Sequence, residues 1–460
     1  MSDSPPPASS ALLAKIQELM LPLLLGVVAA LLVANLFPET YAAILHLTPF
    51  GHGVELHGHP VDLKFLIDDV FMVLFFGIAA KEIAHSALPG GSLNPPSKAL
   101  TPLLATVGGV LVPVIVYFGA GYALYRFGAF DELMRIYAIE RAPGALDPSF
   151  GVIAIGWGIP TATDIALAWL VARQVFGRGR APVKFLLLLA VGDDAIGLVI
   201  IAVVYPDPAL PVQPLWLALV AAAALVSWWL RRRGVRRWWL YVLLGGPLAW
   251  IGLFNAHVHP ALALCAVVPF LPGPSPRALA DEDDPVEQLV GDPHRHSPLD
   301  DFEHTLKPFV DFGLFFFAFA NAGVQMSSFG WLSILIAGSL IGGKIIGVPL
   351  FVFGARLMGL RLPDGMGLRE VVLAGYVAGL GLTVALFVAT QAYPVRIFGP
   401  ELQGEAKMGA LLTLVVGMTA IPLARAIGVR KLSADGTHTA TSTTDAARAD
   451  GPAVVEGSKT

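Results

Sequence analysis

Long apolar runs recur along the whole chain, and this feature constrains the fold more than any other. Within a bilayer only helices and closed barrels satisfy all of their own backbone hydrogen bonds, and a helix needs about 20 apolar residues to cross. The chain has 460 residues, of which 55% are hydrophobic and 14% are charged, and its mean hydropathy is +0.70. Soluble proteins of this length are far more polar. The sequence therefore predicts an all-α polytopic membrane protein.

The apolar runs are long enough for about twelve transmembrane helices. These spans are predicted at residues 20–37, 63–87, 99–124, 151–175, 182–204, 213–230, 238–254, 256–271, 308–326, 331–356, 370–394 and 406–428. Lys and Arg concentrate in alternate loops, most densely at 231–237 after the sixth span. Because basic loops stay in the cytoplasm, both termini are predicted to be cytoplasmic.

Polar segments flank and interrupt the predicted transmembrane domain, residues 20–428. Residues 1–19 form a short cytoplasmic N-terminal segment, and the polar tail 429–460 is predicted to be disordered. Residues 272–307 are acidic and rich in proline, which is typical of a flexible cytoplasmic linker. This loop separates the two halves of the domain.

Residues 48–63 alternate apolar and polar side chains, which predicts a short external β-hairpin. Its histidines, His52, His57 and His59, could bind a metal, but a packing or dimer contact is the favoured interpretation. The single cysteine, Cys265, excludes an intramolecular disulfide. The net charge of −4 lies in loops and tails and gives no indication of nucleic-acid binding.

Two adjacent aspartates, Asp193 and Asp194, lie in the middle of the fifth predicted span. The helix from Pro182 to Asp193 is about 17 Å long, so the pair lies near the centre of a hydrocarbon core about 30 Å thick. A charge at that depth costs roughly 2.5–3.5 kcal/mol and marks a candidate functional site. Consecutive helical side chains point about 100° apart, so the two carboxylates are expected to meet different neighbours.

Two spans contain residues that interrupt a helix at similar depth. In the fourth span, glycines and Pro160 precede Thr163 and Asp164, and proline breaks a helix because it lacks a backbone donor. The eleventh span has a glycine cluster at 375–381. Paired interruptions in the two halves of a transporter indicate a binding site at the membrane midplane.

The helix ends at these interruptions carry partial charges. Asp164 is expected to balance helix N-termini, and Lys344 is expected to balance C-termini. Lys344 itself lies near the midplane of the tenth span. An unpaired ammonium there would lose its proton or draw in water, so Lys344 is expected to pair with Asp193 or Asp194.

The chain resembles the NhaA-type sodium/proton antiporters over residues 20–428, because five segments occur in that family's order and spacing. The segments are TATDIA at 161–166, VGDDAIG at 191–197, FAFANAGV at 317–324, LIGGKIIG at 340–347 and GLGLTVALF at 379–387. The resemblance implies twelve helices with inverted repeats, in which spans four and eleven cross as broken helices. It also implies a multi-pass protein of the bacterial inner membrane and a homodimer joined through the external hairpin.

The resemblance also assigns roles to individual residues. It implies that Asp194 is the principal carboxylate for Na⁺ and protons. Asp193 then pairs with Lys344 when sodium is absent, and Thr163 and Asp164 border the site.

A second set of residues resembles positions tied to the pH response at the cytoplasmic face. These are Glu82, His85, His259, Glu303, His304 and Lys307. His85 and Lys307 depart from the residues usual in the family. The surroundings of the site are therefore altered, while the residues of the site itself are intact.

These features predict a transporter rather than an enzyme. The transporter is expected to extrude Na⁺ or Li⁺ in exchange for H⁺ and to need no cofactor. With two carboxylates and a lysine, more than one proton per sodium is chemically possible, so electrogenic exchange is expected. A sodium-coupled symporter is one alternative, and it would need a second pocket for an organic substrate. An intramembrane aspartyl protease is another, but AVGD at 190–193 lacks the first glycine of its GxGD pattern, and Lys344 would oppose a shared proton.

Overall fold

The computed structural model describes most of the chain. The described residues are 20–51, 55–56, 59–89, 91, 93, 96–177, 179–206, 210–274, 297–360, 362 and 366–429. The predicted N-terminal segment 1–19, residues 275–296 of the acidic loop and residues 430–460 of the tail lie outside these ranges.

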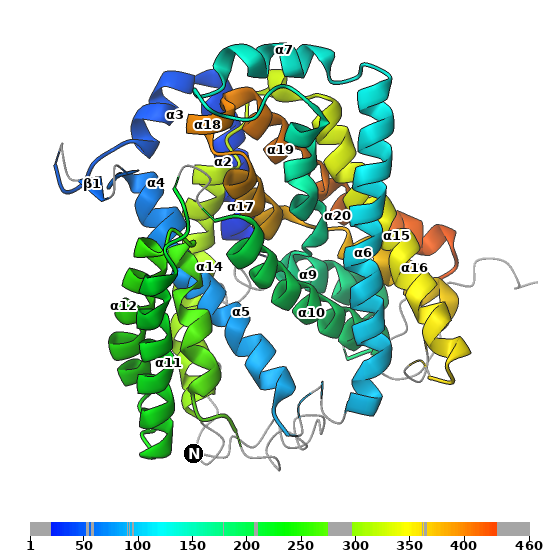
Figure 1. Ribbon diagram of the computed structural model, residues 1–460. Helices are drawn as coiled ribbons and strands as arrows, with labels where there is room; N and C mark the ends of the chain where they lie inside the picture. The colour runs from blue at the N-terminus through cyan, green and yellow to red at the C-terminus, as the bar shows by residue number, and fades with distance from the viewer. Residues whose placement is uncertain are drawn as a thin grey trace, which may run out of the picture.

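The described elements are helical apart from one short hairpin (Figure 1). In chain order they are α2 (Leu21–Leu36), α3 (Pro38–Leu45), β1 (Glu55–Leu56), β2 (His59–Pro60), α4 (Leu63–Phe65), η1 (Leu66–Phe71), α5 (Met72–Ala87), α6 (Pro96–Arg126), α7 (Asp131–Glu140), α8 (Phe150–Ala154), η2 (Ile155–Thr161), α9 (Ile165–Phe176), α10 (Ala181–Val204), η3 (Pro214–Trp216), α11 (Leu217–Arg232), α12 (Trp238–Asn255), η4 (Pro260–Ala266), η5 (Val268–Phe270), α14 (Pro298–Asn321), η8 (Met326–Ser328), α15 (Trp331–Leu357), α16 (Leu368–Ala378), α17 (Leu382–Ala392), α18 (Val395–Phe398), α19 (Pro400–Leu412) and α20 (Leu414–Ala426). The predicted hairpin is confirmed, because β1 and β2 pair antiparallel with Glu55 opposite Pro60.

Among the described residues, six helical segments are individually long and apolar enough to cross a membrane. They are α6, α10, η3 with α11, α12, α15, and α19 with α20. Two further spans are bent pairs: α8 and η2 meet α9 at 51°, and α16 meets α17 at 46°. The architecture is thus that of a polytopic membrane protein, and the breaks predicted in the fourth and eleventh spans are confirmed.

Two sequence-based boundaries were wrong. Residues 256–271 form the short 3₁₀ helices η4 and η5 rather than a regular α-helix. His257 has a left-handed backbone with a φ of 59°, and Pro260 and Pro269 follow it closely, so an α-helix cannot continue there. The acidic linker also ends earlier than residue 307, because α14 begins at Pro298 with Ser297 accepting a hydrogen bond from Asp300 N at 3.2 Å.

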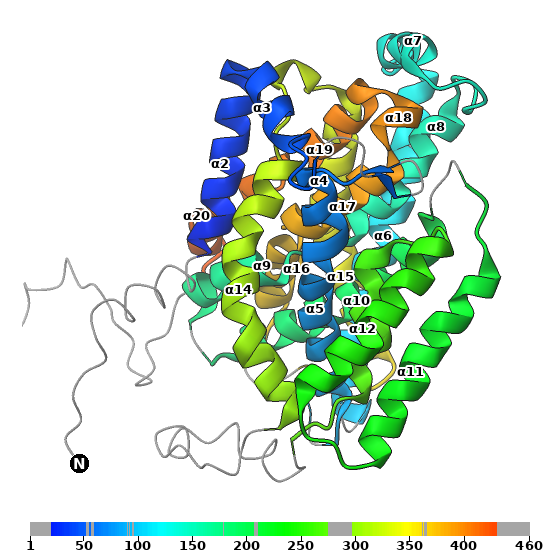
Figure 2. The same cartoon turned by 90° about the vertical axis from the view of Figure 1, so that its left-hand side faces the viewer.

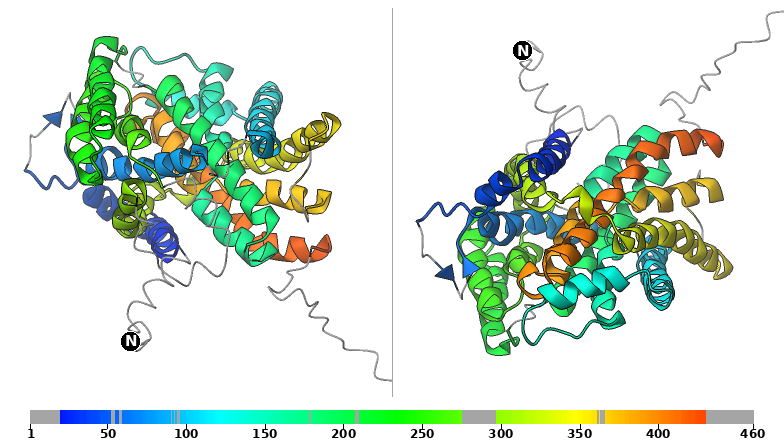
Figure 3. Two further views of the ribbon diagram at one scale, coloured as in Figure 1. Left: turned by 90° about the horizontal axis from the view of Figure 1, so that it is seen from below. Right: turned by 90° about the horizontal axis from the view of Figure 1, so that it is seen from above.

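The helices form two groups with the broken helices between them. Helices α2, α5, α11, α12 and α14 gather on one side, and α6, α15, α16 and α20 gather on the other (Figures 1 and 3). Helices α9, α10 and α17 lie between the groups. In Figure 2, α11 lies at the outer edge and packs chiefly on α12. This arrangement places both helix breaks in the interior.

Close glycine contacts fix the packing of α6 on α15. A Cβ atom at Gly108 would lie 2.4 Å from the carbonyl oxygen of Gly347, and one at Gly347 would lie 2.1 Å from that of Gly108. Only glycine permits backbones to approach so closely, which is a common device in membrane helix packing. The contact holds α15, and with it Lys344, against the centre of the molecule.

Candidate functional site

The two helix breaks lie directly against each other. The backbone N–H of Asp164 donates to the carbonyl of Leu380 at 2.6 Å, and the Thr163 hydroxyl lies 2.9 Å from the carbonyl of Ala378. Ala378 is the last residue of α16, and Leu380 lies in the break between α16 and α17. Backbone groups that the breaks leave without helical partners are therefore satisfied across the contact, as a non-helical segment in a membrane requires.

Gly381 is the residue that permits this approach. A Cβ atom at this position would lie 2.8 Å from the carbonyl oxygen of Ala162 and 2.5 Å from a methyl group of Leu340. The carbonyl belongs to the backbone and cannot move aside easily. Gly381 therefore serves close contact between the broken helices.

Asp164 caps the N-termini of both second half-helices. Its Oδ1 accepts from the N–H of Leu167 at 3.1 Å in the first turn of α9, and its Oδ2 accepts from the N–H of Thr383 at 3.1 Å in α17. A carboxylate at a helix N-terminus is stabilised by unpaired N–H groups and by the helix dipole. These bonds confirm the predicted contact of Asp164 with helix N-termini.

Lys344 forms a fully buried ion pair with Asp193 rather than with Asp194. Its Nζ donates to Asp193 Oδ2 at 2.5 Å and to the Thr163 hydroxyl at 2.5 Å, and neither charged side chain is exposed. Thr163 also lies 2.6 Å from Asp193 Oδ2. The structure thus selects one of the two partners that the sequence left open for Lys344.

Asp194 lies beside this pair without a partner of its own. It is 8% exposed, and its Oδ1 is buried and makes no hydrogen bond to any described residue. Among the described residues, two other side-chain atoms are buried without a hydrogen-bond partner, Asp193 Oδ1 and Ser339 Oγ. An unpaired buried carboxylate is costly, and a cation or a proton would offset that cost.

The residues predicted for the pH response divide into two places. Glu82 and Glu303 meet around Lys81, which lies 3.6 Å from Glu82 and forms an ion pair with Glu303. Lys307 lies 4.0 Å from Glu303. His85 and His304 lie on the same two helices, close to this cluster. The sequence analysis named Glu82 and Glu303 and missed the central position of Lys81 between them.

His259 does not belong to that cluster, so its predicted placement was wrong. It lies 3.8 Å from Asp69 and lines a cavity with His46 and Pro60, the latter from the hairpin. Asp69 and Lys81 are twelve residues apart on one continuous helical segment, or about 18 Å. His259 begins the 3₁₀ helix η4, and the unpredicted break before η4 puts it at the hairpin end of the molecule.

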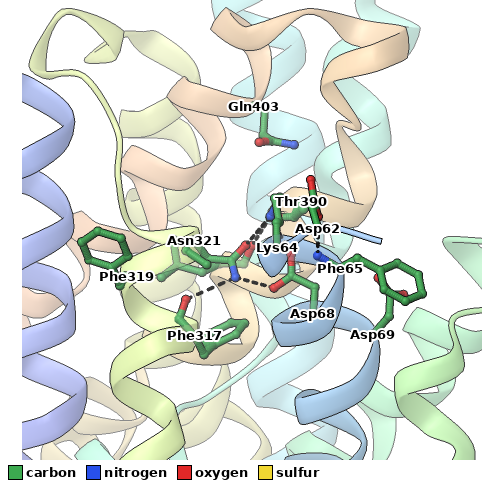
Figure 4. Close-up of polar contacts among 12 residues, drawn as sticks. Asp62, Lys64, Phe65, Asp68, Asp69, Phe317, Phe319, Asn321, Thr390 and Gln403 are labelled. Atoms are coloured by element: carbon green, nitrogen blue, oxygen red, sulfur yellow. Dashed lines mark hydrogen bonds and ion pairs between the residues drawn. The ribbon is translucent and has the colours of Figure 1, made fainter. Parts of the chain in front are cut away.

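A second buried polar cluster escaped the sequence analysis (Figure 4). Lys64 and Asp68 form an ion pair at 2.6 Å, and Asn321 and Thr390 join it from α14 and α17. The charges were visible in the sequence as KFLIDD at 64–69, within the second span. Their position near the start of that span resembled a solvated helix end, and only the packed structure shows that they are enclosed.

The described residues hold no cluster of three or more His, Cys, Asp or Glu side chains that could bind a metal. His52 and His57 of the hairpin lie outside the described residues. Cys265 is a free thiol whose sulfur lies 3.7 Å from the carbonyl of Phe76.

Comparison with known proteins identifies the family. A family model described as "Na+/H+ antiporter 1" matches residues 12–125 and 147–423. A Na(+)/H(+) antiporter NhaA of Geobacter sulfurreducens is 49% identical over 417 residues, which are 91% of this chain and 98% of that protein. A protein of the same name from Desulfitobacterium hafniense is 48% identical over 417 residues, 91% of this chain and 96% of its own length. The chain belongs to the Na+/H+ antiporter 1 family, and the symporter and protease alternatives are not favoured.

Proposed function

We propose that this protein exchanges Na⁺, and also Li⁺, for H⁺, with Asp194 as the carboxylate that binds either ion. The observation that carries the proposal is the contrast between the two adjacent aspartates. Asp193 is paired through Oδ2 with Lys344 and Thr163, whereas Asp194 is buried beside them and has no hydrogen-bond partner among the described residues. A free carboxylate at the meeting point of two broken helices is suited to a small cation.

Competition for Asp194 couples the two ions. Sodium is a hard cation that prefers oxygen ligands, and a proton binds the same carboxylate oxygens. When the site faces the side with more protons, a proton displaces sodium. When it faces the other side, loss of the proton restores a negative charge that attracts sodium. Alternating access of one site therefore exchanges the ions.

The ion pair beside the site supplies a second element of the cycle. Sodium that approaches Asp194 also approaches Lys344, and the like charges repel. Release of Asp193 from Lys344 would give sodium a second carboxylate ligand. Two carboxylates and a lysine allow more than one proton per sodium, so we propose electrogenic exchange.

We extend the proposal to the setting of the protein. Together with α2, α5, α14 and the segment of η4 and η5, the eight spans described above make twelve, with crossed inverted repeats. The protein lies in the bacterial inner membrane, and both termini are cytoplasmic. Two copies associate through the hairpin of β1 and β2. The alternation of basic loops supports the orientation, and the family supports the remainder.

The test is proton movement driven by sodium in everted membrane vesicles. A fluorescent pH probe should report alkalinisation of the lumen when Na⁺ or Li⁺ is added to the native chain. Asp194→Asn should abolish this response and leave a folded protein, because it removes charge and keeps shape. Asp147→Asn is the matched control, since Asp147 is 89% exposed and pairs with Arg141. Equal exchange in the Asp194→Asn protein would place the ion site elsewhere.

A further inference from the structure

The cluster around Asp68 holds an ammonium group against two oxygen atoms (Figure 4). Lys64 Nζ donates to Asp68 Oδ2 at 2.6 Å and to Asn321 Oδ1 at 3.3 Å. The Thr390 hydroxyl donates to the same Asn321 oxygen at 3.2 Å. Asn321 Nδ2 in turn donates to Asp68 Oδ1 at 2.7 Å. Two elements, η1 and α14, thus supply the oxygens that contact the ammonium, and Thr390 of α17 bonds the Asn321 oxygen beside it.

The same chemistry recurs at the principal site. Lys344 Nζ donates to a buried aspartate and to a threonine hydroxyl. Lys64 Nζ likewise donates to a buried aspartate and to the amide oxygen of Asn321, which also accepts a hydrogen bond from the Thr390 hydroxyl. The difference is mobility, because the Lys64 side chain is 27% exposed whereas that of Lys344 is fully enclosed. Lys64 has a flexible stem and open space beside it.

That space is a cavity of about 390 Å³, lined by Lys64, Asp68 and Thr390 and by the further carboxylates Asp62 and Asp69. No hydrogen bond to the Asp69 carboxylate is seen among the described residues, and the basic group beside it is the His259 imidazole at 3.8 Å. A Lys64 side chain that turns into the cavity would therefore find carboxylates there. Its departure would leave the Asp68 and Asn321 oxygens open to another cation.

We propose that Asp68, Asn321 and Thr390 form a second, transient site for Na⁺, which Lys64 occupies with its own ammonium in this structure. The inference rests on the proposed function, because it assigns the site to ions that pass between the cavity and Asp194. Its position fits that role. Thr390 lies seven residues beyond Thr383, the residue that caps Asp164, which is about 10 Å along α17.

Binding of ²²Na⁺ to purified protein in detergent tests the proposal with the principal site disabled by Asp194→Asn. Adding Lys64→Met should create saturable Na⁺ binding that Li⁺ displaces, and further addition of Asp68→Asn should abolish it. Lys307→Met is the matched control, because Lys307 also lies four residues from an acidic partner and should create no site.

Absence of Na⁺ binding in the folded Asp194→Asn, Lys64→Met protein would overturn the proposal, as would binding that survives Asp68→Asn. If the combined variants do not fold, Lys64→Met alone decides by calorimetry: two Na⁺ per chain support the site and one refutes it. Sodium-driven exchange by the native chain separates the two hypotheses. Loss of that exchange would refute the proposed function, whereas intact exchange without a second Na⁺ would refute only the second site.

Discussion

Removing one partner of the Lys344–Asp193 pair should destabilise the protein far more than removing both. Lys344→Gln leaves Asp193 buried, with Thr163 as its remaining hydrogen-bond partner at 2.6 Å. Its Oδ1 already lacks a partner. The substitution therefore leaves an uncompensated charge in a region of low dielectric constant.

The expected magnitude follows from the burial of both groups. Each side chain is 0% exposed, and their contact is 2.5 Å long. Breaking such a pair from one side typically costs about 3–5 kcal/mol, whereas replacing both charges is often close to neutral. The double variant Asp193→Asn, Lys344→Gln should therefore recover most of the stability that either single variant loses.

Thermal unfolding of purified protein in one detergent measures this cycle. The melting temperature should fall clearly in Lys344→Gln and Asp193→Asn and should rise again when the two changes are combined. If the two residues stabilise each other, the coupling energy between the two changes should lie well above the roughly 0.3–0.5 kcal/mol by which independent sites depart from additivity. Strictly additive destabilisation in the double variant would mean that these residues do not stabilise each other, and it would refute the reasoning.

Two further predictions concern the helix breaks and the cluster around Lys81. Gly381→Ala should lower the free energy of unfolding by about 1–3 kcal/mol through overpacking, because the new Cβ would lie 2.8 Å from Ala162 O. Gly338→Ala is the control, since a Cβ there meets nothing within 4 Å. Equal melting temperatures of the two variants would contradict the close contact. Burial raises the pKa of Glu303, but Lys81 above all opposes this and holds the pKa below its usual value. The stability that Glu303 contributes should therefore be present above the ordinary carboxyl pKa and be lost as the pH falls through the lowered pKa, so the melting temperatures of the native and Glu303→Gln proteins should converge in acid; a difference that is independent of pH would refute this.

The elements of the principal site were predictable because each carries a local signal. Pro160 and the glycines at 375–381 disrupt a helix wherever they occur in an apolar run. A charge in the middle of such a run is costly enough to be noticed without any knowledge of its neighbours. The sequence therefore located Asp164, Asp193, Asp194 and Lys344 at one depth.

Partners were harder to predict than depths, because a partner lies on another helix. Both Asp193 and Asp194 were open to Lys344, and the choice depends on how α10 and α15 are rotated about their axes. Placement failed for His259, where the predicted span at 256–271 proved to be two short 3₁₀ helices. Hydropathy does not distinguish such a segment from a regular span, because both are apolar.

The cluster around Asp68 was missed for a different reason. Lys64 lies near the end of a predicted span, where charges are normally solvated, and Asn321 and Thr390 carry no charge at all. Neither residue type is unusual in a membrane helix. Their bonds to one another run between α14, α17 and η1, which are more than 60 residues apart along the chain. Tertiary packing alone brings them together.

Charge balance connects the two clusters once their members are known. At the principal site the helix N-termini satisfy Asp164 and Lys344 satisfies Asp193, so one carboxylate, Asp194, remains and calls for a mobile cation or a proton. In the second cluster the Lys64 ammonium pairs with Asp68, and the further carboxylates Asp62 and Asp69 line the adjoining cavity, so a cation that enters the cavity meets oxygen ligands. Under the two proposals, sodium binds at Asp194 where exchange occurs, and the Asp68 cluster, about 10 Å along α17, receives it between that site and the cavity.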